Sequence, residues 1–409
     1  IHACVMTRGV SKRNREGISM REVAIVGGGA TKAGKREATW RDLVQEAGKQ
    51  MFESVDNISP NDIEGLLVGA AQPERFVFQA HVAPMIAEYL GIIPKKVIAR
   101  TELMCGSGQA AIRYAWACIA SGMVDLAVAF GVEKMFMPDM AEAQTNMTCV
   151  LDREWDGING LSAPPFFAMT AQRHMLKYGT TKEQMARVSV KNHHYSSMNP
   201  LAQFQKEITV EHVLKSPIVA PPLNLFDCSG ITDGAAGIVL APAEDAKKYT
   251  DTPMYIIGGG QANIGNAINN LASVTEWVPL KMAVDETLRT AKITIDDIDI
   301  AELHDCFTIS EIMEYEAFGW CKKGEGGEFI EDGEPYIGGR VAVNPRGGLL
   351  GCGHPLGATA ILQTIDILQQ FRGEVPKGRL VDGAEVAVAH NLSGAANVHS
   401  IIAYSRSLR

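Results

Sequence analysis

The chain has 409 residues, more than a single hydrophobic core usually spans, so two or more lobes are expected. Its formal net charge of −9 argues against a nucleic-acid-binding surface, which needs clustered lysine and arginine. No apolar run reaches the roughly 18–20 residues of a membrane-spanning helix, so no membrane role is expected.

The eight cysteines are scattered, with no Cys-x-x-Cys pair and no Cys/His cluster at zinc spacing. This pattern predicts neither a disulfide framework nor a metal site, and it indicates a reducing, cytoplasmic compartment. Residues 1–19 are basic and poor in apolar side chains. Because their amphipathic pattern is weak, we interpret them as an upstream extension or a cloning remnant before Met20, not as a transit peptide.

From Arg21 onward the pattern is α/β. The apolar run Val23–Val26 predicts a buried strand, and three glycines follow it. A dinucleotide-binding Gly-x-Gly-x-x-Gly would need glycine at Lys32, so the glycines are expected to shape a turn instead. Further helices are expected at 40–53, 81–90 and 109–121, and further strands at 65–69 and 125–130.

Parts of this pattern occur twice. Val23–Gly29 recurs as Met254–Gly260, and Asp125–Phe130 recurs as Glu385–His390. The duplication predicts two equivalent lobes, formed by residues 20–132 with 225–250 and by residues 251–409. Residues 133–224 are an insertion between them. In such a pair the equivalent helices lie side by side, and their N-termini meet at one crevice, where ligands of open α/β sheets bind.

Reactive side chains stand at those helix starts. Cys105 lies in Cys-Gly-Ser-Gly before the helix at 109–121, and a helix N-terminus favours the thiolate. A lone cysteine is more often a small core residue, but the repeat brings it next to His354, which lies in a second glycine-rich loop. A third segment, Glu302–Phe307, adds His304 and Cys306. Together these groups suit acyl transfer through a thioester.

These three motifs resemble those of the thiolases. Gly351–Ala358 is similar to the thiolase Gly-His-Pro motif, and Cys105 is similar to the thiolase nucleophile. His304-Asp-Cys-Phe307 replaces the Asn-Glu-Ala-Phe of most thiolases and resembles the sterol-carrier-protein-type branch. The resemblance implies a thiolase fold, a duplicated five-layered α-β-α-β-α core. Residues 133–224 would then be the loop domain that covers coenzyme A.

The resemblance also implies a role for each reactive residue. Cys105 would carry the acyl group and His354 would be the base that activates its thiol. Cys306 would move the proton at the α carbon, and His304 would stabilise the enolate-like oxygen.

Two further segments belong to this expected site. The Asn391–Gly394 loop would contribute backbone N–H groups to an oxyanion hole, with Asn391 and Gly394 as its site residues. Ser229 matches the serine that touches the pantetheine arm, although a simple turn role is equally open. Most thiolases carry a second cysteine in a Cys-x-Gly motif where this chain has His390, so His390 is the alternative proton carrier to Cys306.

The expected activity is thiolytic cleavage of a 3-oxoacyl-CoA or the reverse Claisen condensation. Coenzyme A is a substrate, and no bound cofactor is expected. The segments around Thr308 and Lys323 resemble thiolases that work with a small OB-fold, zinc-ribbon subunit, namely archaeal-type acetoacetyl-CoA thiolases and benzoylsuccinyl-CoA thiolase. The overall similarity favours the aromatic substrate. Thiolases pair through the strand that precedes the nucleophile, here Val97–Leu103, so the resemblance implies at least a homodimer.

Two rival functions come from other classes. A ketoacyl-synthase-like condensing enzyme would use two histidines and no second thiol, so Cys306 argues against it. A non-catalytic acyl-CoA or lipid carrier would have no reason to keep all four reactive groups.

Overall fold

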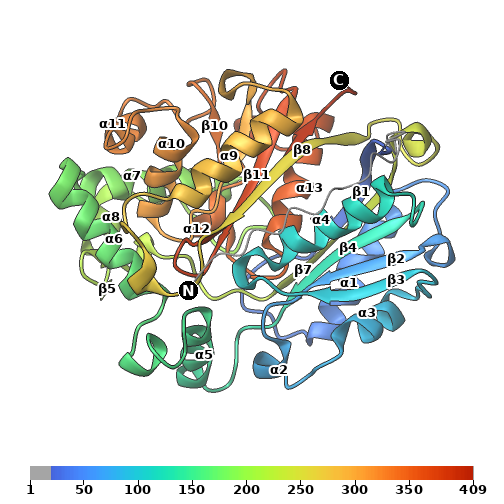
Figure 1. The fold of residues 1–409 in the computed structure, drawn as a ribbon, viewed down its shortest axis with the longest axis horizontal. Helices are drawn as coiled ribbons and strands as arrows, with labels where there is room; N and C mark the ends of the chain where they lie inside the picture. The colour runs from blue at the N-terminus through green and yellow to red at the C-terminus, as the bar shows by residue number, and fades with distance from the viewer. Residues whose placement is uncertain (1–19, 409) are drawn as a thin grey trace, which may run out of the picture.

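The computed structural model describes residues 20–408, so the interpretation of residues 1–19 lies outside the described part of the chain. Its centre is a ten-stranded sheet with the order β10-β9-β11-β12-β8-β1-β7-β4-β2-β3 (Figure 1). The strands are β1 (Val23–Ala30), β2 (Gly65–Gly69), β3 (Val97–Thr101), β4 (Ala127–Glu133), β7 (Gly234–Pro242), β8 (Met254–Asn263), β9 (Ile300–Glu302), β10 (Ala342–Val343), β11 (Val386–Ser393) and β12 (Val398–Ser405).

The strand order repeats in two matching halves. Counted from the middle outward, β1-β7-β4-β2-β3 corresponds to β8-β12-β11-β9-β10. In each half the first two pairings are antiparallel and the last two are parallel. The halves join through a short antiparallel pairing of Val23–Ile25 with Met254–Ile256. The duplication predicted from the sequence repeats is therefore present in the sheet itself.

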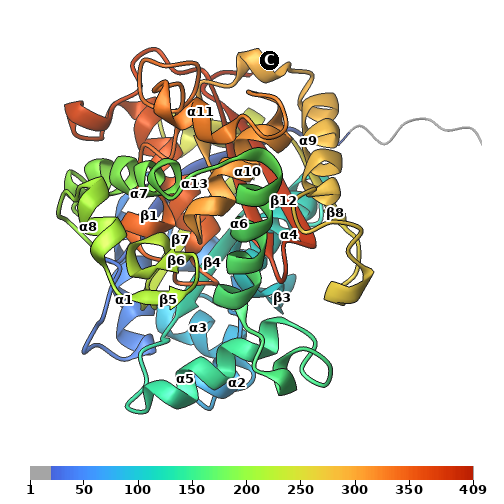
Figure 2. The ribbon, with the colours of Figure 1, turned by 90° about the vertical axis from the view of Figure 1, so that its left-hand side faces the viewer.

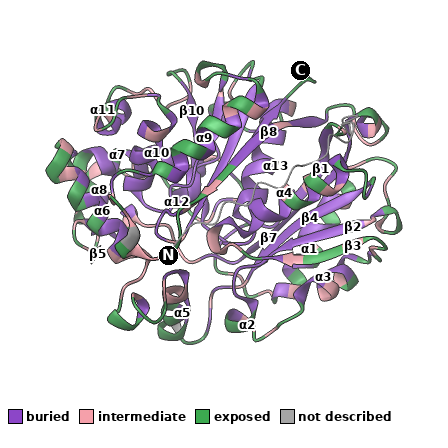
Figure 3. Ribbon diagram, in the orientation of Figure 1, coloured by how far each residue is buried: buried purple, intermediate pink, exposed green. Residues whose placement is uncertain are grey.

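Helices pack in three layers around the two halves. An outer layer of α1 (Trp40–Glu53) and α3 (Val82–Leu90) covers the first half, and one of α9 (Val278–Ala291) and α10 (Thr308–Phe318) covers the second. The middle layer is α4 (Ser107–Ala120) and α13 (Thr359–Arg372), which contact strands of both halves. Figure 3 shows α13 buried along almost its whole length, as expected for a helix packed between the two halves of the sheet. This confirms the five-layered core.

The other elements decorate this core. They are α2 (Pro73–Phe76), α5 (Met140–Met147), α6 (Ala163–Tyr178), α7 (Lys182–Ser197), α8 (Val210–Lys215), α11 (Gly326–Glu331), α12 (Gly348–Cys352), and the hairpin of β5 (Ile218–Ala220) and β6 (Leu223–Asn224). Helices α6 to α8 gather beside the second half (Figure 2). Helix α7 contacts α10 and α12, and the buried Lys191 pairs with Glu311 at 3.0 Å. Within residues 20–408, no helix is long and apolar enough to cross a membrane.

The prediction that glycines 27–29 shape a turn is wrong, because β1 continues through them to Ala30. The reason is helix packing. A Cβ on Gly29 would lie 2.6 Å from the backbone oxygen of Ala47 in α1, so only glycine lets the helix approach the strand this closely. Gly258 and Gly260 have the same relation to α9. The alternation of residues along a strand does not reveal how closely a helix packs against it.

Candidate active site

Three predicted residues from distant parts of the chain meet in the crevice between the two halves. Cys105 lies in a 3₁₀ turn (Met104–Gly106) that runs into α4, His304 follows β9, and His354 lies between α12 and α13. The Cys105 Sγ and one ring nitrogen of each histidine all lie within 4.8 Å of one another. The two imidazole rings meet edge to face, with centroids 4.8 Å apart.

Glycines make this meeting possible. The carbonyl oxygen of Gly357, in the loop that carries His354, sits against Gly69 of β2, Gly108 of α4 and Gly131 of β4. A Cβ would come within 2.8 Å of that oxygen at Gly69 and within 2.6 Å at Gly108. Any side chain there would push the His354 loop away from the start of α4, where Cys105 lies.

The hydrogen bonds of His354 fix its tautomer. Its Nδ1 lies 2.7 Å from the Thr359 hydroxyl, and that hydroxyl donates to the carbonyl oxygen of Pro355 at 3.0 Å. Because the hydroxyl proton is already used, Nδ1–H must be the donor, and Nε2 is left with a free lone pair. The Nε2 atom is buried and has no hydrogen-bond partner among residues 20–408. An unprotonated nitrogen of this kind can accept a proton as a general base.

The acidity expected for Cys105 is not found. The pKa of its thiol is raised to about 12, mainly by desolvation and to a smaller extent by the charges of Glu133 and Glu102, while its own backbone N–H opposes the shift. The prediction of an easily ionised thiol is therefore wrong, because burial outweighs the helix terminus. Burial also lowers the pKa of His354 to about 3, and the positive charge of Arg346 adds to this shift. The resting pair is a neutral thiol and a neutral imidazole.

His304 and Cys306 complete the cluster. Both ring nitrogens of His304 are buried and lack hydrogen-bond partners in the described part of the chain. Burial, followed by the nearby His354, holds the pKa of His304 well below its usual range. Burial and the proximity of Cys105 raise the pKa of Cys306 well above that of a free cysteine, and its Sγ lies 3.7 Å from the hydroxyl of Ser310. Both groups are buried and neutral.

The expected oxyanion loop lies beside the nucleophile. Ser393 donates to the carbonyl oxygen of Leu103 at 2.7 Å, which ties this loop to the turn that carries Cys105. Gly394 follows with φ of 66°, a conformation that favours glycine. Asn391 instead points to α13 and donates to Gln363 at 2.5 Å. Its side chain therefore supports the loop from behind.

Ser229 and His390 occupy different surroundings. The backbone N–H of Ser229 donates to the carbonyl oxygen of Cys306 at 2.9 Å, so Ser229 adjoins the catalytic cluster. His390 is fully buried and bonds to His399 at 2.9 Å through its Nε2. Its Nδ1 lies 3.5 Å from Glu314, so both ring nitrogens face protein groups.

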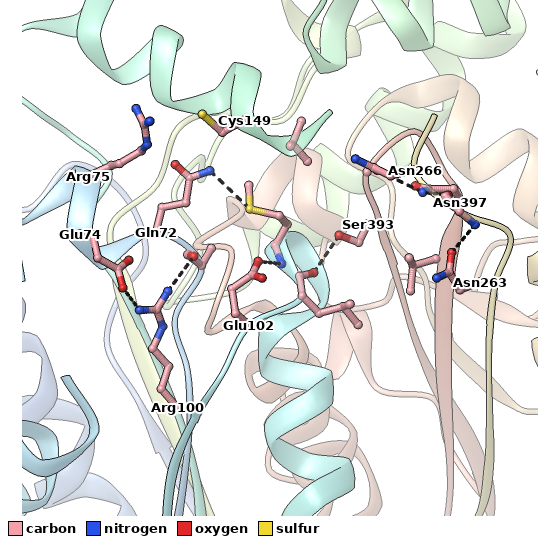
Figure 4. Close-up of a pocket in the computed structure, with 17 residues that line it drawn as sticks. Gln72, Glu74, Arg75, Arg100, Glu102, Cys149, Asn263, Asn266, Ser393 and Asn397 are labelled. Atoms are coloured by element: carbon pink, nitrogen blue, oxygen red, sulfur yellow. Dashed lines mark hydrogen bonds and ion pairs between the residues drawn. The ribbon is translucent and has the colours of Figure 1, made fainter. Parts of the chain in front are cut away.

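A cavity of about 630 Å³ opens beside Met104, the residue before the nucleophile. Figure 4 shows its two walls. One wall is charged and comes from β2, β3 and the segments after them, with Glu74, Arg75, Arg100 and Glu102. The other is uncharged and polar, with Asn263, Asn266, Ser393 and Asn397.

Two residues that the sequence did not single out, Thr359 and Glu133, contact the loop that carries His354. Thr359 stands five residues after His354, and only the hydrogen-bond geometry reveals that it sets the tautomer. Glu133 ends β4 and accepts backbone N–H bonds from Ala71 at 2.5 Å and Gly357 at 3.2 Å. Burial raises the pKa of Glu133 to about 7. In the sequence, the position of this glutamate at the end of an apolar strand is the feature that could have singled it out.

The cluster of Cys105, His304 and His354 has the spacing of a group that could hold a metal ion. One thiol and two imidazoles are a donor set that suits zinc. The expectation that this chain carries no metal stays a prediction.

A thiol next to a free imidazole nitrogen, with a second thiol and a second imidazole close by, is an arrangement that suits a cysteine-dependent acyltransferase. Comparison with known families assigns residues 23–244 to the thiolase N-terminal domain and residues 260–406 to the C-terminal domain-like region. The chain belongs to the thiolase family.

Relatives place it within that family. It is 41% identical to an acetyl-CoA acetyltransferase of Methanothermobacter thermautotrophicus, over 95% of this chain and 100% of that protein. It is 32% identical to the benzoylsuccinyl-CoA thiolase subunit BbsB of Thauera aromatica, over 91% and 95%. It is also 32% identical to sterol carrier protein 2 of Bos taurus, over 90% and 70%, which confirms the sterol-carrier-protein-type branch.

A solved structure, the Ltp2-ChsH2(DUF35) aldolase, matches 96% of this chain and 100% of its own, with a TM-score of 0.81 and 23% identity. This likeness concerns the fold. The family assignment selects the thiolase among the rival functions considered from the sequence.

Proposed function

We propose that the chain interconverts acetoacetyl-CoA and coenzyme A with two molecules of acetyl-CoA through an acyl group on Cys105. The free Nε2 lone pair of His354 beside the Cys105 thiol carries the proposal. The acetyl substrate rests on the 41% identity to an acetyl-CoA acetyltransferase, compared with 32% to a benzoylsuccinyl-CoA thiolase subunit. Similarity thus favours the acetyl substrate over the aromatic one, and benzoylsuccinyl-CoA remains the second candidate.

The first half-reaction uses the neutral pair. In the cleavage direction the Cys105 sulfur bonds to the 3-oxo carbon while its proton passes to His354 Nε2. The bond between the second and third carbons breaks, and the Cys306 thiol protonates the second carbon, which leaves as acetyl-CoA. His354 then returns its proton to Cys306. A cysteine whose pKa is raised holds its proton until this step, which suits a general acid.

The second half-reaction releases the acyl group. The thiol of free coenzyme A attacks the Cys105 thioester and gives its proton to His354, and the departing Cys105 thiolate takes that proton and becomes the thiol again. His304 would stabilise the enolate oxygen of the first half-reaction. Backbone N–H groups of Cys105 and the Asn391–Gly394 loop would stabilise the thioester oxyanion.

Three further assignments accompany the reaction. Residues 133–224 would form the loop domain over coenzyme A, between the halves 20–132 with 225–250 and 251–409, and Ser229 would touch the pantetheine arm. We assign no cofactor besides this substrate and no metal. A cytoplasmic location is supported by the seven cysteines that are free in residues 20–408.

Partners are proposed on separate grounds. Strand β3 ends the sheet, which supports a homodimer through its free edge. The likeness to a structure that names a DUF35 protein supports a small OB-fold, zinc-ribbon subunit.

The test is a substrate panel with intact-mass detection. Acetoacetyl-CoA should leave an acetyl adduct that Cys105→Ala lacks, and added coenzyme A should remove it. Benzoylsuccinyl-CoA as the faster substrate would overturn the acetyl assignment, and an unchanged adduct in Cys105→Ala would overturn the nucleophile. Full turnover by the purified chain would remove the reason for a second subunit.

A further inference from the structure

A buried carboxyl group remains that the proposed reaction does not use. Glu314 lies on α10, fully buried, and neither of its oxygens has a hydrogen-bond partner within residues 20–408. Nδ1 of His390 lies 3.5 Å from Oε1 of Glu314, and within the same residues that nitrogen also lacks a hydrogen-bond partner. Leaving such groups unpaired is expensive, so a shared proton between them is the simplest way to satisfy both.

His390 continues into a chain of hydrogen bonds. Its Nε2 lies 2.9 Å from Nδ1 of His399, and Nε2 of His399 lies 2.9 Å from the carbonyl oxygen of Ala396. The two rings are nearly parallel, with an interplanar angle of 8° and centroids 5.2 Å apart, as expected for imidazoles that hydrogen-bond edge to edge. The chain thus runs from α10 through β11 and β12 to the turn between those two strands.

The carbonyl oxygen of Ala396, at the end of this chain of hydrogen bonds, determines which atom is the donor in each of them. A carbonyl only accepts, so His399 carries its proton on Nε2 and presents a bare Nδ1. His390 must then donate from Nε2, and its own bare Nδ1 faces Glu314. Glu314 must therefore carry the last proton. The pKa directions agree, since burial raises the pKa of Glu314 and lowers those of both histidines.

Each end of this chain of hydrogen bonds lies close to a segment of the candidate site. At one end, the backbone N–H of His304 opposes the effect of burial on the pKa of Glu314, so this carboxyl group lies close to the His304 segment. Ala396 lies in the turn 394–397, with φ of 53°, a strained value for alanine. Ser393, just before this turn, and Asn397, its last residue, lie on the uncharged wall of the cavity in Figure 4. One chain of neutral groups thus links the His304 segment to the Gly394 turn.

We propose that Glu314, His390 and His399 are positioning residues that hold the 394–397 turn in register with His304. The proposal rests on the proposed function, in which the same turn supplies an oxyanion donor. It also assigns His390 a place behind the site, as a link that keeps its proton, rather than the role of proton carrier considered from the sequence.

The experiment compares Glu314→Gln with Glu314→Leu. A glutamine amide can donate to His390 without charge, so the glutamine variant should acylate Cys105 at a rate close to wild type. The leucine variant leaves His390 Nδ1 unpaired and frees the turn. Misplacing an oxyanion donor slows a reaction by roughly 10–100-fold, so the leucine variant should lose about that much. Equal loss in both variants would show that a carboxylate charge is required and would overturn the proposal.

A second pair and a second readout cover other outcomes. His399→Gln can keep both hydrogen bonds and His399→Leu cannot, so this pair replaces the first if Glu314→Leu does not fold. Hydrogen–deuterium exchange of residues 391–399 should rise in the leucine variants and not in the glutamine ones. This readout needs no acyl transfer, so it separates failure of the positioning role from failure of the proposed function. Unchanged exchange in the leucine variants would overturn the positioning role.

Discussion

The proposed nucleophile and its proposed base, Cys105 and His354, are both neutral. His354 has a bare Nε2 because Thr359 occupies its Nδ1, and Cys105 keeps its proton because desolvation raises the pKa of its partly exposed thiol. The sequence predicted both residues from their glycine-rich motifs and brought them together through the repeat. It gave the wrong direction for the thiol pKa, because burial is a property of the assembled halves and not of one helix.

The first prediction concerns Thr359. Thr359→Val removes the hydroxyl that fixes the His354 tautomer, so a fraction of the molecules will present a protonated Nε2 to Cys105. Since a correctly placed general base contributes about 10²–10⁴-fold, we expect acylation to slow at least tenfold, while Thr359→Ser stays close to wild type. Rapid-quench intact-mass analysis measures this rate. Equal rates in the valine and serine variants would contradict the role of the hydroxyl.

The second prediction concerns Glu133 and pH. Its pKa is raised from 4.5 to about 7 by burial, so the folded state holds the proton more tightly than the unfolded state. This contribution to stability is fully present below about pH 4.5 and is lost as pH rises to about 7. It amounts to roughly 3 kcal/mol.

Glu133→Gln keeps an oxygen for the two backbone N–H groups but does not titrate. Denaturant unfolding between pH 5 and pH 8 should therefore show a smaller loss of stability in the variant than in the wild type. Parallel curves for the two proteins would contradict the raised pKa.

Among the elements, glycines decide which surfaces can touch. The helical period of 40–53 and the strand period of 65–69 were readable in the sequence, and α1 and β2 occupy almost those residues. The extension of β1 through its three glycines was not readable, because it depends on how closely α1 approaches. The same physical cause operates at the site, where three glycines surround the Gly357 carbonyl oxygen.

Strand β2 offers a matched pair of variants for the third prediction. Gly69→Ala places a Cβ 2.8 Å from that oxygen, whereas Gly65→Ala, in the same strand, meets only ordinary contacts at 3.5 Å or more. We expect Gly69→Ala to displace the His354 loop and to slow acylation by about 10²-fold, with little effect from Gly65→Ala. The acylation assay and a melting curve measure both variants. Similar activity in the two would show that the loop tolerates the added methyl group.

At the scale of the whole molecule, the duplication leaves the sheet with two unlike ends. The edge strand of the C-terminal half, β10, is two residues long, whereas the edge strand of the N-terminal half, β3, has five residues. Strand β3 also carries the exposed Ile98. Long edge strands with exposed apolar side chains invite pairing, and natural proteins block them with lysine or cover them. The covering expected here is a second copy of the chain.

The last prediction tests that covering. Ile98→Lys places a charge on the free edge of β3 and should weaken self-association, because two copies paired through this edge would bring the two charges into the apolar contact. Met282→Lys is the matched control, since Met282 is also a large exposed apolar residue but lies on α9. Light scattering over a concentration series should give a dimer for the wild type and the control, and a shift towards monomer for Ile98→Lys. A monomeric wild type would contradict the predicted dimer. A wild-type dimer that Ile98→Lys leaves intact would place the interface elsewhere than β3.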